Sequence, residues 1–324
     1  MSEIILSETE IKKMVELASV INVSPNENAE LFCMQSKKLS LCIPDRIRTI
    51  LMDFAKCGSP TGFLLIKSIP VDDMCIGPTP PDNTHLMGGK TELAKVQSLF
   101  IHTISEMIAY EAEGYGQLFQ DIVPNKTMSQ NQTSLGSHTE LEIHTEQAFS
   151  DLRPDFLSLA CLRSDPDAYT HIFPVKSLVD GLTETDKCLL REPLWKTGVD
   201  LSFKLHSKEF IKGDVRGPFP IIYGDVDDPL LIFDQDLMEG VTESACEIVK
   251  KIVDVYYERR IRHRLMPGEI IILDNRRAVH GRSPFFPRFD GKDRFLIRCF
   301  SRVDYDSTLY ARPGNGRMIS AIYS

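Results

Sequence analysis

Residues 134–150 read Ser-Leu-Gly-Ser-His-Thr-Glu-Leu-Glu-Ile-His-Thr-Glu-Gln-Ala-Phe-Ser and contain the pattern His-x-Glu twice, at His138/Glu140 and at His144/Glu146. On a β-strand, residues i and i+2 point to the same face, so either pair can direct an imidazole and a carboxylate toward one point. Two histidines and one carboxylate on one side of a metal, with the other positions open, form the site of non-haem Fe(II) oxygenases. The stretch therefore predicts a metal site that needs one further histidine.

The best candidate for that ligand is His280, which lies in a segment of distinctive composition. Residues 267–282 begin with Pro-Gly, continue through a run of aliphatic residues and end in Asp-Asn-Arg-Arg-Ala-Val-His-Gly-Arg. This order predicts a turn, a buried strand at Glu269–Leu273 and a loop that carries the histidine. A single His-x-Glu is common on exposed strands and loops, and it is the distal segment that favours a metal site.

Spacing alone does not distinguish the two His-x-Glu pairs, because an offset of six residues keeps both on one face of a strand. Two features favour the second pair as ligands. Phe149 and Phe156 follow it and offer apolar walls, whereas His138 comes two residues after Gly136, where a loop is expected. The alternative for the first pair is a loop histidine and, in Glu140, a solvated acid.

A row of arginines at residues 294, 298 and 302 lies within the apolar segment 294–303. On a strand all three side chains share one face, and a buried arginine needs an anionic partner. The guanidinium matches carboxylate geometry, so the row predicts carboxylate binding, with a structural salt bridge as the alternative. The same metal ligands can hold catalytic zinc. The row favours iron, with a 2-oxo acid as the cosubstrate.

Composition limits the function classes. The chain has 324 residues, 42% of them hydrophobic, and a formal net charge of −9, which argues against a nucleic-acid-binding face. We see no secretory signal and no run of residues apolar enough to span a membrane, so a cytoplasmic protein with a small-molecule substrate is expected. The eight cysteines are scattered without a Cys-x-x-Cys pair, which predicts reduced, buried thiols. A monomer is expected.

Helical patterns dominate up to residue 130 and short strand patterns dominate from residue 131 onward. The predicted helices are at 7–18, 27–37, 44–58, 91–111, 175–192 and 242–259, and the main predicted strands are at 63–67, 156–162, 169–173, 220–223, 230–233 and 294–303. A proline-rich loop at 70–89 is long enough to cover a pocket mouth. Helices followed by many strands predict an antiparallel barrel or sandwich wrapped by helices, as one domain over residues 1–324.

Together these motifs resemble the Fe(II)/2-oxoglutarate oxygenases related to taurine dioxygenase, and among them the clavaminate synthase-like group. The resemblance is carried by His144-Thr-Glu146, by the segment from Pro267 to Arg282 and by the arginine strand, and it extends over essentially the whole chain. It implies a mainly β fold, a double-stranded β-helix or jelly roll, with helices added at the N-terminus and as insertions.

The resemblance also implies roles for individual residues. His144, Glu146 and His280 would bind Fe(II), while Arg294, assisted by Thr170, would pair with the distal carboxylate of 2-oxoglutarate.

Three further residues would contact the prime substrate, which is expected to carry a carboxylate and a cationic group. Arg298 would meet the carboxylate, Asp234 would meet the cation and Ser134 would add a further contact.

The activity implied is oxidation in clavulanic acid biosynthesis, with O2 and 2-oxoglutarate consumed and succinate and CO2 released. One enzyme would hydroxylate a β-lactam amino acid, close its second ring oxidatively and desaturate the product to clavaminic acid. A related arginine or amino-acid β-hydroxylase with the same iron site is the nearest alternative. A His2Glu zinc hydrolase and a jelly-roll binding module with a decayed site are the alternatives of other classes. The intact metal triad and Arg294 argue against decay.

Overall fold

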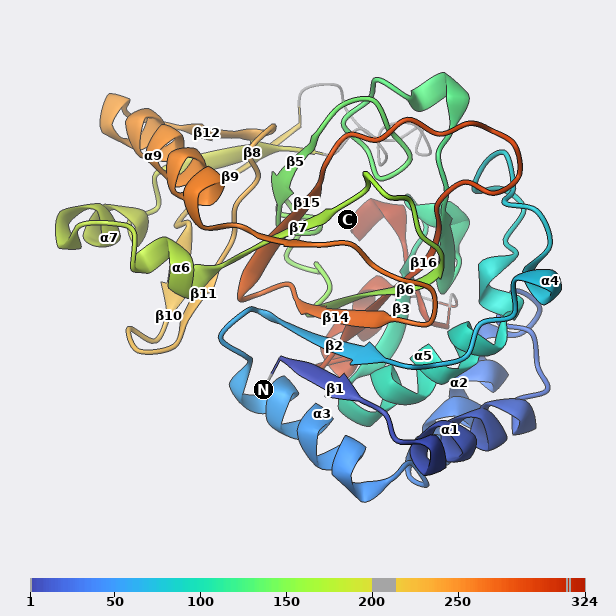
Figure 1. Cartoon of the computed structure of the whole chain (residues 1–324). Helices are drawn as coiled ribbons and strands as arrows, with labels where there is room; N and C mark the ends of the chain where they lie inside the picture. The colour runs from blue at the N-terminus through green and yellow to red at the C-terminus, as the bar shows by residue number, and fades with distance from the viewer. Residues whose placement is uncertain (1, 200–213, 313, 315, 324) are drawn as a thin grey trace.

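Two β-sheets face each other and enclose the interior of the protein (Figure 1). The computed structural model describes residues 2–199, 214–312, 314 and 316–323. In spatial order the larger described sheet contains β1 (Glu3–Ile5), β2 (Phe63–Lys67), β14 (Ile270–Asp274), β6 (Phe156–Arg163), β16 (Phe295–Arg302), β3 (Glu106–Tyr110) and β17 (Met318–Ile319), with β4 (Phe119–Ile122) also paired to β16. The smaller sheet contains β13 (Ile261–His263), β7 (Thr170–Pro174), β15 (Ala278–Arg282) and β5 (Leu141–His144). This arrangement is the predicted jelly roll.

Strand β16 shows why the larger sheet has two different faces. Its residues at 295, 297 and 299 pack with the N-terminal helices, whereas Leu296 and Phe300 pack in the core between the two sheets. Because side chains alternate along a strand, the arginines at even positions point inward with this second set. The two-residue alternation therefore places charged side chains in the interior of the barrel.

Helices α1 (Glu8–Val20), α2 (Ala29–Ser40), α3 (Asp45–Cys57) and α5 (Glu92–Ile104) cover the outer face of the larger sheet (Figure 1). The predicted capping box of the first helix is present, because Ser7 and Glu10 exchange hydrogen bonds. Residues 1–130 were predicted to be mostly helical, but β1, β2, β3 and β4 come from this part of the chain. The helices and the sheet share one hydrophobic core.

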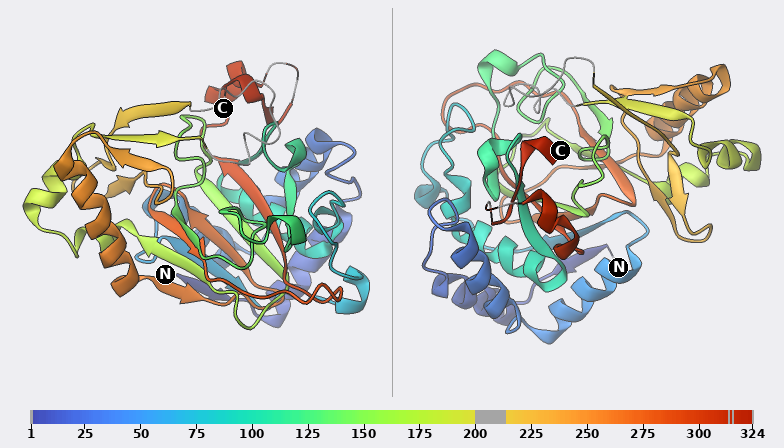
Figure 2. Two further views of the ribbon diagram at one scale, coloured as in Figure 1. Left: turned by 90° about the horizontal axis from the view of Figure 1, so that it is seen from above. Right: turned by 180° about the vertical axis from the view of Figure 1, so that it is seen from behind.

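A wing, defined here as residues 175–199 and 214–259, projects from the outer face of the smaller sheet (Figure 2). It contains α6 (Val175–Val179), α7 (Glu184–Leu190), β8 (Trp195–Gly198), β9 (Val215–Phe219), β10 (Ile222–Gly224), β11 (Pro229–Leu231), β12 (Met238–Gly240) and α9 (Glu243–Arg259). Buried side chains of the wing pack in one cluster with Ile143, Phe173 and Val279 of the smaller sheet. Short helices elsewhere are α4 (Asp73–Ile76), η1 (Gly88–Lys90), η2 (Gly114–Gly116), η3 (Lys126–Met128), η4 (Asp306–Ala311) and η5 (Ala321–Tyr323).

Three sequence predictions about the fold were wrong in part. The helix predicted for residues 91–111 ends at Ile104, because Ser105 is fully extended and the next five residues form β3, of which the first three pair with β16. A short apolar run does not distinguish helix from strand. His280 lies on strand β15 rather than on a loop, since the turn is confined to residues 275–277. The cysteines are free, as predicted, but only Cys33, Cys161 and Cys299 are buried.

No helix in the described parts of the chain is both long and apolar enough to cross a membrane.

Trp195, the single tryptophan of the sequence, tests whether the wing and the barrel unfold together. It is fully buried in the wing and donates a hydrogen bond from Nε1 to the carbonyl of Ala245 at 3.1 Å. Because the wing shares its core with the smaller sheet, we expect urea-unfolding curves from tryptophan fluorescence and from far-ultraviolet circular dichroism to coincide. A fluorescence transition at lower urea than the dichroism transition would instead show that the wing is a separate folding unit.

Candidate active site

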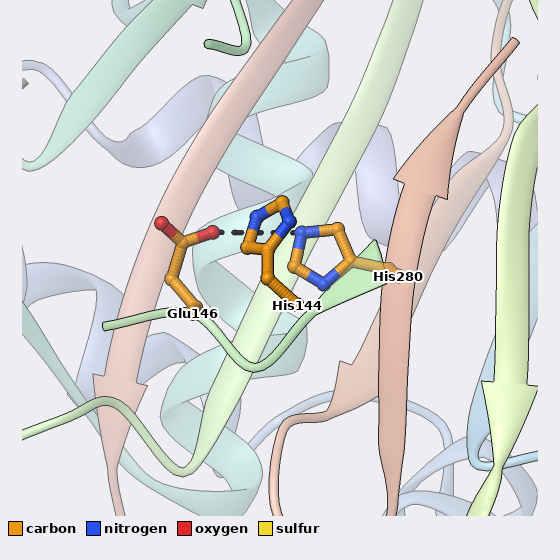
Figure 3. Close-up of side chains that lie close together, drawn as sticks. All are labelled: His144, Glu146 and His280. Carbon is orange, nitrogen blue, oxygen red and sulfur yellow. Dashed lines mark ion pairs between the residues drawn. The ribbon is translucent and has the colours of Figure 1, made fainter. Parts of the chain in front are cut away.

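The structure brings His144, Glu146 and His280 together between the two sheets, as the sequence predicted. His144 ends β5 and is the register partner of His280 on β15, while Glu146 follows two residues beyond the strand end. The three side chains converge on one point (Figure 3), and one ligand atom from each lies within 4.8 Å of the others. Nε2 of His280 lies 3.5 Å from Oε2 of Glu146.

Backbone and amide contacts hold two of these ligands in place. Nδ1 of His144 lies 2.9 Å from the carbonyl oxygen of Glu142, which can only accept a hydrogen bond. Nδ1 therefore carries a proton, and Nε2 is the ring nitrogen left for a metal. The side chain of Asn275 accepts a hydrogen bond from the amide of Glu146 at 2.8 Å and donates to its carbonyl at 3.1 Å. The loop carrying the carboxylate is thus tied to the end of β14.

The charge state of the triad suits a divalent metal. Burial raises the pKa of the Glu146 carboxyl, but Arg298 and the two imidazoles outweigh burial and lower it to about 2. Burial, reinforced by His144, lowers the pKa of His280 to about 4, so this imidazole is neutral near pH 7. Oε2 of Glu146 is buried and has no hydrogen-bond partner among the described residues. An ionised carboxylate with an unsatisfied oxygen facing two imidazoles is the donor set of a metal site.

An inner cavity lies beside the triad and is lined by Thr170, His280, Arg282 and Arg294. The guanidinium of Arg294 is almost fully buried, and burial lowers its pKa to about 10, so it remains charged at neutral pH. No ion pair or hydrogen bond of the Arg294 side chain is found within the described residues. Its guanidinium carbon lies 5.8 Å from the Phe285 ring centre, and Cys161 and Asp165 are the neighbours that act to raise its pKa. A buried cation of this kind needs an anionic ligand.

An outer cavity adjoins the inner one, and Ser134 and Arg298 line both. Arg298 forms ion pairs with Glu113 and, at 3.5 Å, with Oε1 of Glu146, and it also donates to Gln120. The structure therefore places Arg298 between a metal-ligand carboxylate and a second buried carboxylate.

Three further acids, Glu142, Asp234 and Asp236, belong to the lining of the outer cavity. Asp234 is bridged to His144 through the backbone, and its Oδ1 accepts hydrogen bonds from the amides of Asp236 and Leu237 at 3.0 and 2.9 Å. Burial, followed by the charges of Asp236 and Glu140, raises the pKa of Glu142. Three acids lining one partly enclosed cavity favour a cationic group.

The alternative metal pair lies outside the site. His138 accepts a hydrogen bond from Gln130 at 3.1 Å and packs against Phe286, and Glu140 forms a 2.7 Å ion pair with Arg260. β5 begins only at Leu141, so the first pair does not continue the face of the second.

Two further predictions about the neighbourhood of the site were wrong in part. Phe149 and Phe156, expected as cavity walls, are buried in the hydrophobic core. Arg302 donates to the carbonyls of Asp151 and Arg153 and lines neither cavity, so only two of the three row arginines reach the site.

Sequence reasoning missed Glu113, Gln120, Glu142, Asp236 and Asn275. Glu113 precedes a turn in which Tyr115 has a φ of 58°, and nothing in its local pattern shows that it faces Arg298. Asn275 was visible in the Asp-Asn-Arg-Arg motif, but its partner is 129 residues away. The proline-rich loop 70–89 reaches the outer cavity through Asn83.

Comparison with known proteins identifies a matching family model and several relatives. The family model described as "Taurine catabolism dioxygenase TauD, TfdA family" matches residues 223–300, which include His280, Arg294 and Arg298. An L-lysine 3-hydroxylase of Catenulispora acidiphila is 45% identical over 99% of this chain and 89% of its own length. Clavaminate synthase 2 of Streptomyces clavuligerus is 30% identical over 95% of this chain and 94% of its own.

A crystal structure of asparagine oxygenase, in complex with Fe(II), 3-hydroxyasparagine and succinate, superimposes with a TM-score of 0.90 at 31% identity and covers 99% of both chains. The match extends over the N-terminal helices, both sheets and the described wing. With relatives of this identity over nearly its whole length, the chain belongs to the TauD/TfdA family of oxygenases, with Fe(II) as its cofactor and 2-oxoglutarate as its cosubstrate.

Proposed function

We propose that this protein hydroxylates a free basic L-α-amino acid, with lysine as the first candidate, at C3, the carbon next to the α-carbon. One observation carries the proposal: the outer cavity is lined both by a buried cation–anion pair, Arg298 and Glu113, and by three further acids. A basic α-amino acid has the matching charges, a zwitterionic head and a cationic tail.

The α-carboxylate and α-ammonium groups of such a substrate fit the part of the outer cavity formed by Arg298 and Glu113. Both side chains are buried and line the cavity. The α-carboxylate would pair with the guanidinium and the α-ammonium with Glu113, so neither buried charge loses its compensation. Because Arg298 lies 3.5 Å from a carboxylate oxygen of Glu146, the anchored head is next to the metal triad. The carbons closest to the α-carbon are then the ones presented for oxidation.

The tail of the substrate would lie against Glu142, Asp234 and Asp236. A bound ammonium would relieve the repulsion that raises the pKa of Glu142. The 45% identity to a protein named L-lysine 3-hydroxylase supports both the basic tail and the position of hydroxylation.

The overall reaction would convert one C–H bond into C–OH while 2-oxoglutarate and O2 become succinate and CO2. Bound iron supplies the oxidising chemistry, and the protein supplies positioning and exclusion of water. Arg294, with the hydroxyl of Thr170, would hold the distal carboxylate of the cosubstrate in the inner cavity. Ser134, on the boundary of the two cavities, would separate the two ligands.

The β-lactam reactions implied by the sequence resemblance are less well supported than the alternative of amino-acid hydroxylation. The clavaminate synthase relative is 30% identical, against 45% for the lysine hydroxylase, and the asparagine oxygenase structure also contains a hydroxylated amino acid. A zinc hydrolase does not fit membership in the oxygenase family.

Succinate formation with a panel of amino acids tests the proposal. We expect lysine to stimulate turnover strongly, and Nε-acetyl-lysine, which keeps the zwitterionic head but loses the cation, to stimulate it at least about tenfold less, since a buried charge pair is lost. NMR of the product should show a hydroxyl at C3. Equal turnover of both compounds, or activity only with guanidino β-lactams, would overturn the assignment.

Substitution of the acids locates the cation site. Glu142→Gln and Asp236→Asn should each raise the KM for lysine by about tenfold or more, because each removes a charge facing the ammonium. The KM for 2-oxoglutarate should change little. Asp227→Asn, on an exposed turn, is the matched control and should behave as wild type. Unchanged lysine KM values in both test variants would contradict the site.

Substitutions of Arg294 and Arg298 should affect the binding of 2-oxoglutarate and of lysine differently. Arg294→Gln should raise the KM for 2-oxoglutarate far more than the KM for lysine, and Arg298→Gln should do the reverse. Loss of a charge-assisted contact to a desolvated carboxylate costs about 2–5 kcal/mol, or roughly 30- to several-thousand-fold. If either variant shifts both constants equally, the assigned roles are wrong.

Metal retention tests the triad directly. After anaerobic loading with Fe(II) and desalting, His144→Ala and His280→Ala should lose bound iron by more than about 100-fold in affinity, a larger loss than removal of an outer hydrogen-bond partner causes. His138→Ala, whose side chain lies outside the site, should keep the metal and the weak visible absorption band that appears with 2-oxoglutarate. Iron loss in His138→Ala would return the first pair to consideration.

A further inference from the structure

Arg282 is a buried cation whose contacts in the described chain are to backbone carbonyls and an aromatic ring rather than to an acid. It lies on β15, two residues after His280, and only 4% of its surface is exposed. Its Nε donates to the carbonyl of Ser283 at 3.0 Å, one Nη donates to the carbonyl of Thr139 at 2.9 Å, and the other donates to the carbonyl of Gly136. A guanidinium used in this way acts as a clamp on the segment that supplies the carbonyls.

The segment it clamps is the pocket loop, defined here as residues 129–140. Gln132, Thr133, Ser134 and Leu135 of this loop line the outer cavity. The loop turns so tightly at Gly136 that a Cβ there would lie 2.3 Å from the carbonyl oxygen of Asn131. Besides Arg282, the amide of Phe285 holds the loop by donating to the carbonyl of Ser137 at 2.8 Å.

The other side of Arg282 faces the inner cavity, which it lines together with Arg294 and Thr170. Both guanidiniums lie near the Phe285 ring, whose centre is 5.1 Å from the guanidinium carbon of Arg282 and 5.8 Å from that of Arg294. Two buried cations so arranged repel each other unless an anion enters the cavity. Arg282 therefore touches the cosubstrate cavity and the substrate loop at once.

We propose that Arg282 is a positioning residue through which an anionic 2-oxo acid in the inner cavity stabilises the pocket loop, and with it the substrate contacts at Ser134. A bound dicarboxylate would cancel the repulsion from Arg294 and let Arg282 hold its carbonyl contacts more firmly. The identity of the two ligands rests on the proposed function; the clamp itself rests on the contacts of Arg282. Coupling of this kind is reciprocal, so substrate binding would also strengthen cosubstrate binding.

Hydrogen exchange tests the link without any amino-acid substrate. In the full-length protein loaded anaerobically with Fe(II), 2-oxoglutarate should slow amide exchange in residues 129–140. Arg282→Lys keeps the charge but loses the planar fork, so the loop should exchange faster at rest and gain little protection when 2-oxoglutarate is added. Arg302→Lys is the matched control, because Arg302 also donates to two backbone carbonyls but lines neither cavity. Equal protection in wild type and Arg282→Lys would overturn the proposal.

A second variant leaves Arg282 in place. Arg294→Gln removes the neighbouring cation, so the resting loop should exchange more slowly than in wild type even without 2-oxoglutarate. Unchanged or faster resting exchange in that variant would contradict the repulsion on which the link depends, whether or not Arg282→Lys folds.

The KM for lysine provides a second test, because it would not change if Arg282 only stabilised the fold. Arg282→Lys should raise the KM for lysine by about 5- to 150-fold, the usual range of coupling between two sites. The KM for 2-oxoglutarate should rise less, and more succinate should form per hydroxylated product. A larger shift for 2-oxoglutarate than for lysine would show that Arg282 binds the cosubstrate instead. If wild type accepts no basic amino acid, the proposed function fails, and the exchange experiment still decides the role of Arg282.

Discussion

Compensation of charge buried between the two sheets is the constraint on which the rest of the site depends. Arg298 lies between the carboxylates of Glu113 and Glu146, and each group would be costly to bury alone. The pairing keeps Glu146 ionised in a place where burial favours the neutral acid. A dry interior can therefore hold a metal-binding carboxylate together with a guanidinium for a second ligand. Arg294 has no ion pair among the described residues, and the proposed 2-oxoglutarate carboxylate would supply the compensating charge there.

One strand, β16, connects this chemistry to the fold. Its odd-numbered residues fill the core beneath the N-terminal helices, and its even-numbered residues enter the space between the sheets. A slip of one residue would exchange the two sets, placing Arg298 against the helices and Phe295 between the sheets. Pairing with β6 on one side and with β3 and β4 on the other opposes such a slip. The apolar packing of Phe295, Ile297 and Cys299 thus fixes the direction in which Arg298 points.

Sequence reasoning succeeded where function follows strand periodicity and failed where it depends on how distant loops meet. The two-residue spacing of His144 and Glu146 is a local property, and so is the shared face of Arg294 and Arg298. The position of Glu113 is not, since its turn approaches β16 only in the folded chain. The same distinction explains why the pair His138/Glu140 does not lie with the triad. His138 has the spacing of a ligand, but the strand that would direct its side chain toward the site begins three residues later.

The acids of the outer cavity differ in how firmly they are tied to the metal triad, and this difference bears on how specificity can change. Asp234 is bridged to His144, and its carboxylate accepts two backbone hydrogen bonds, so a substitution there would disturb the turn as well as the charge. Glu142 orients His144 through its backbone carbonyl and not through its side chain. A substitution of the side chain therefore leaves that contact in place. Asp236 contributes a backbone amide to the turn. Under the proposed function, substitutions at residues 142 and 236 would change which substrate charge is preferred while the geometry of the metal ligands is retained.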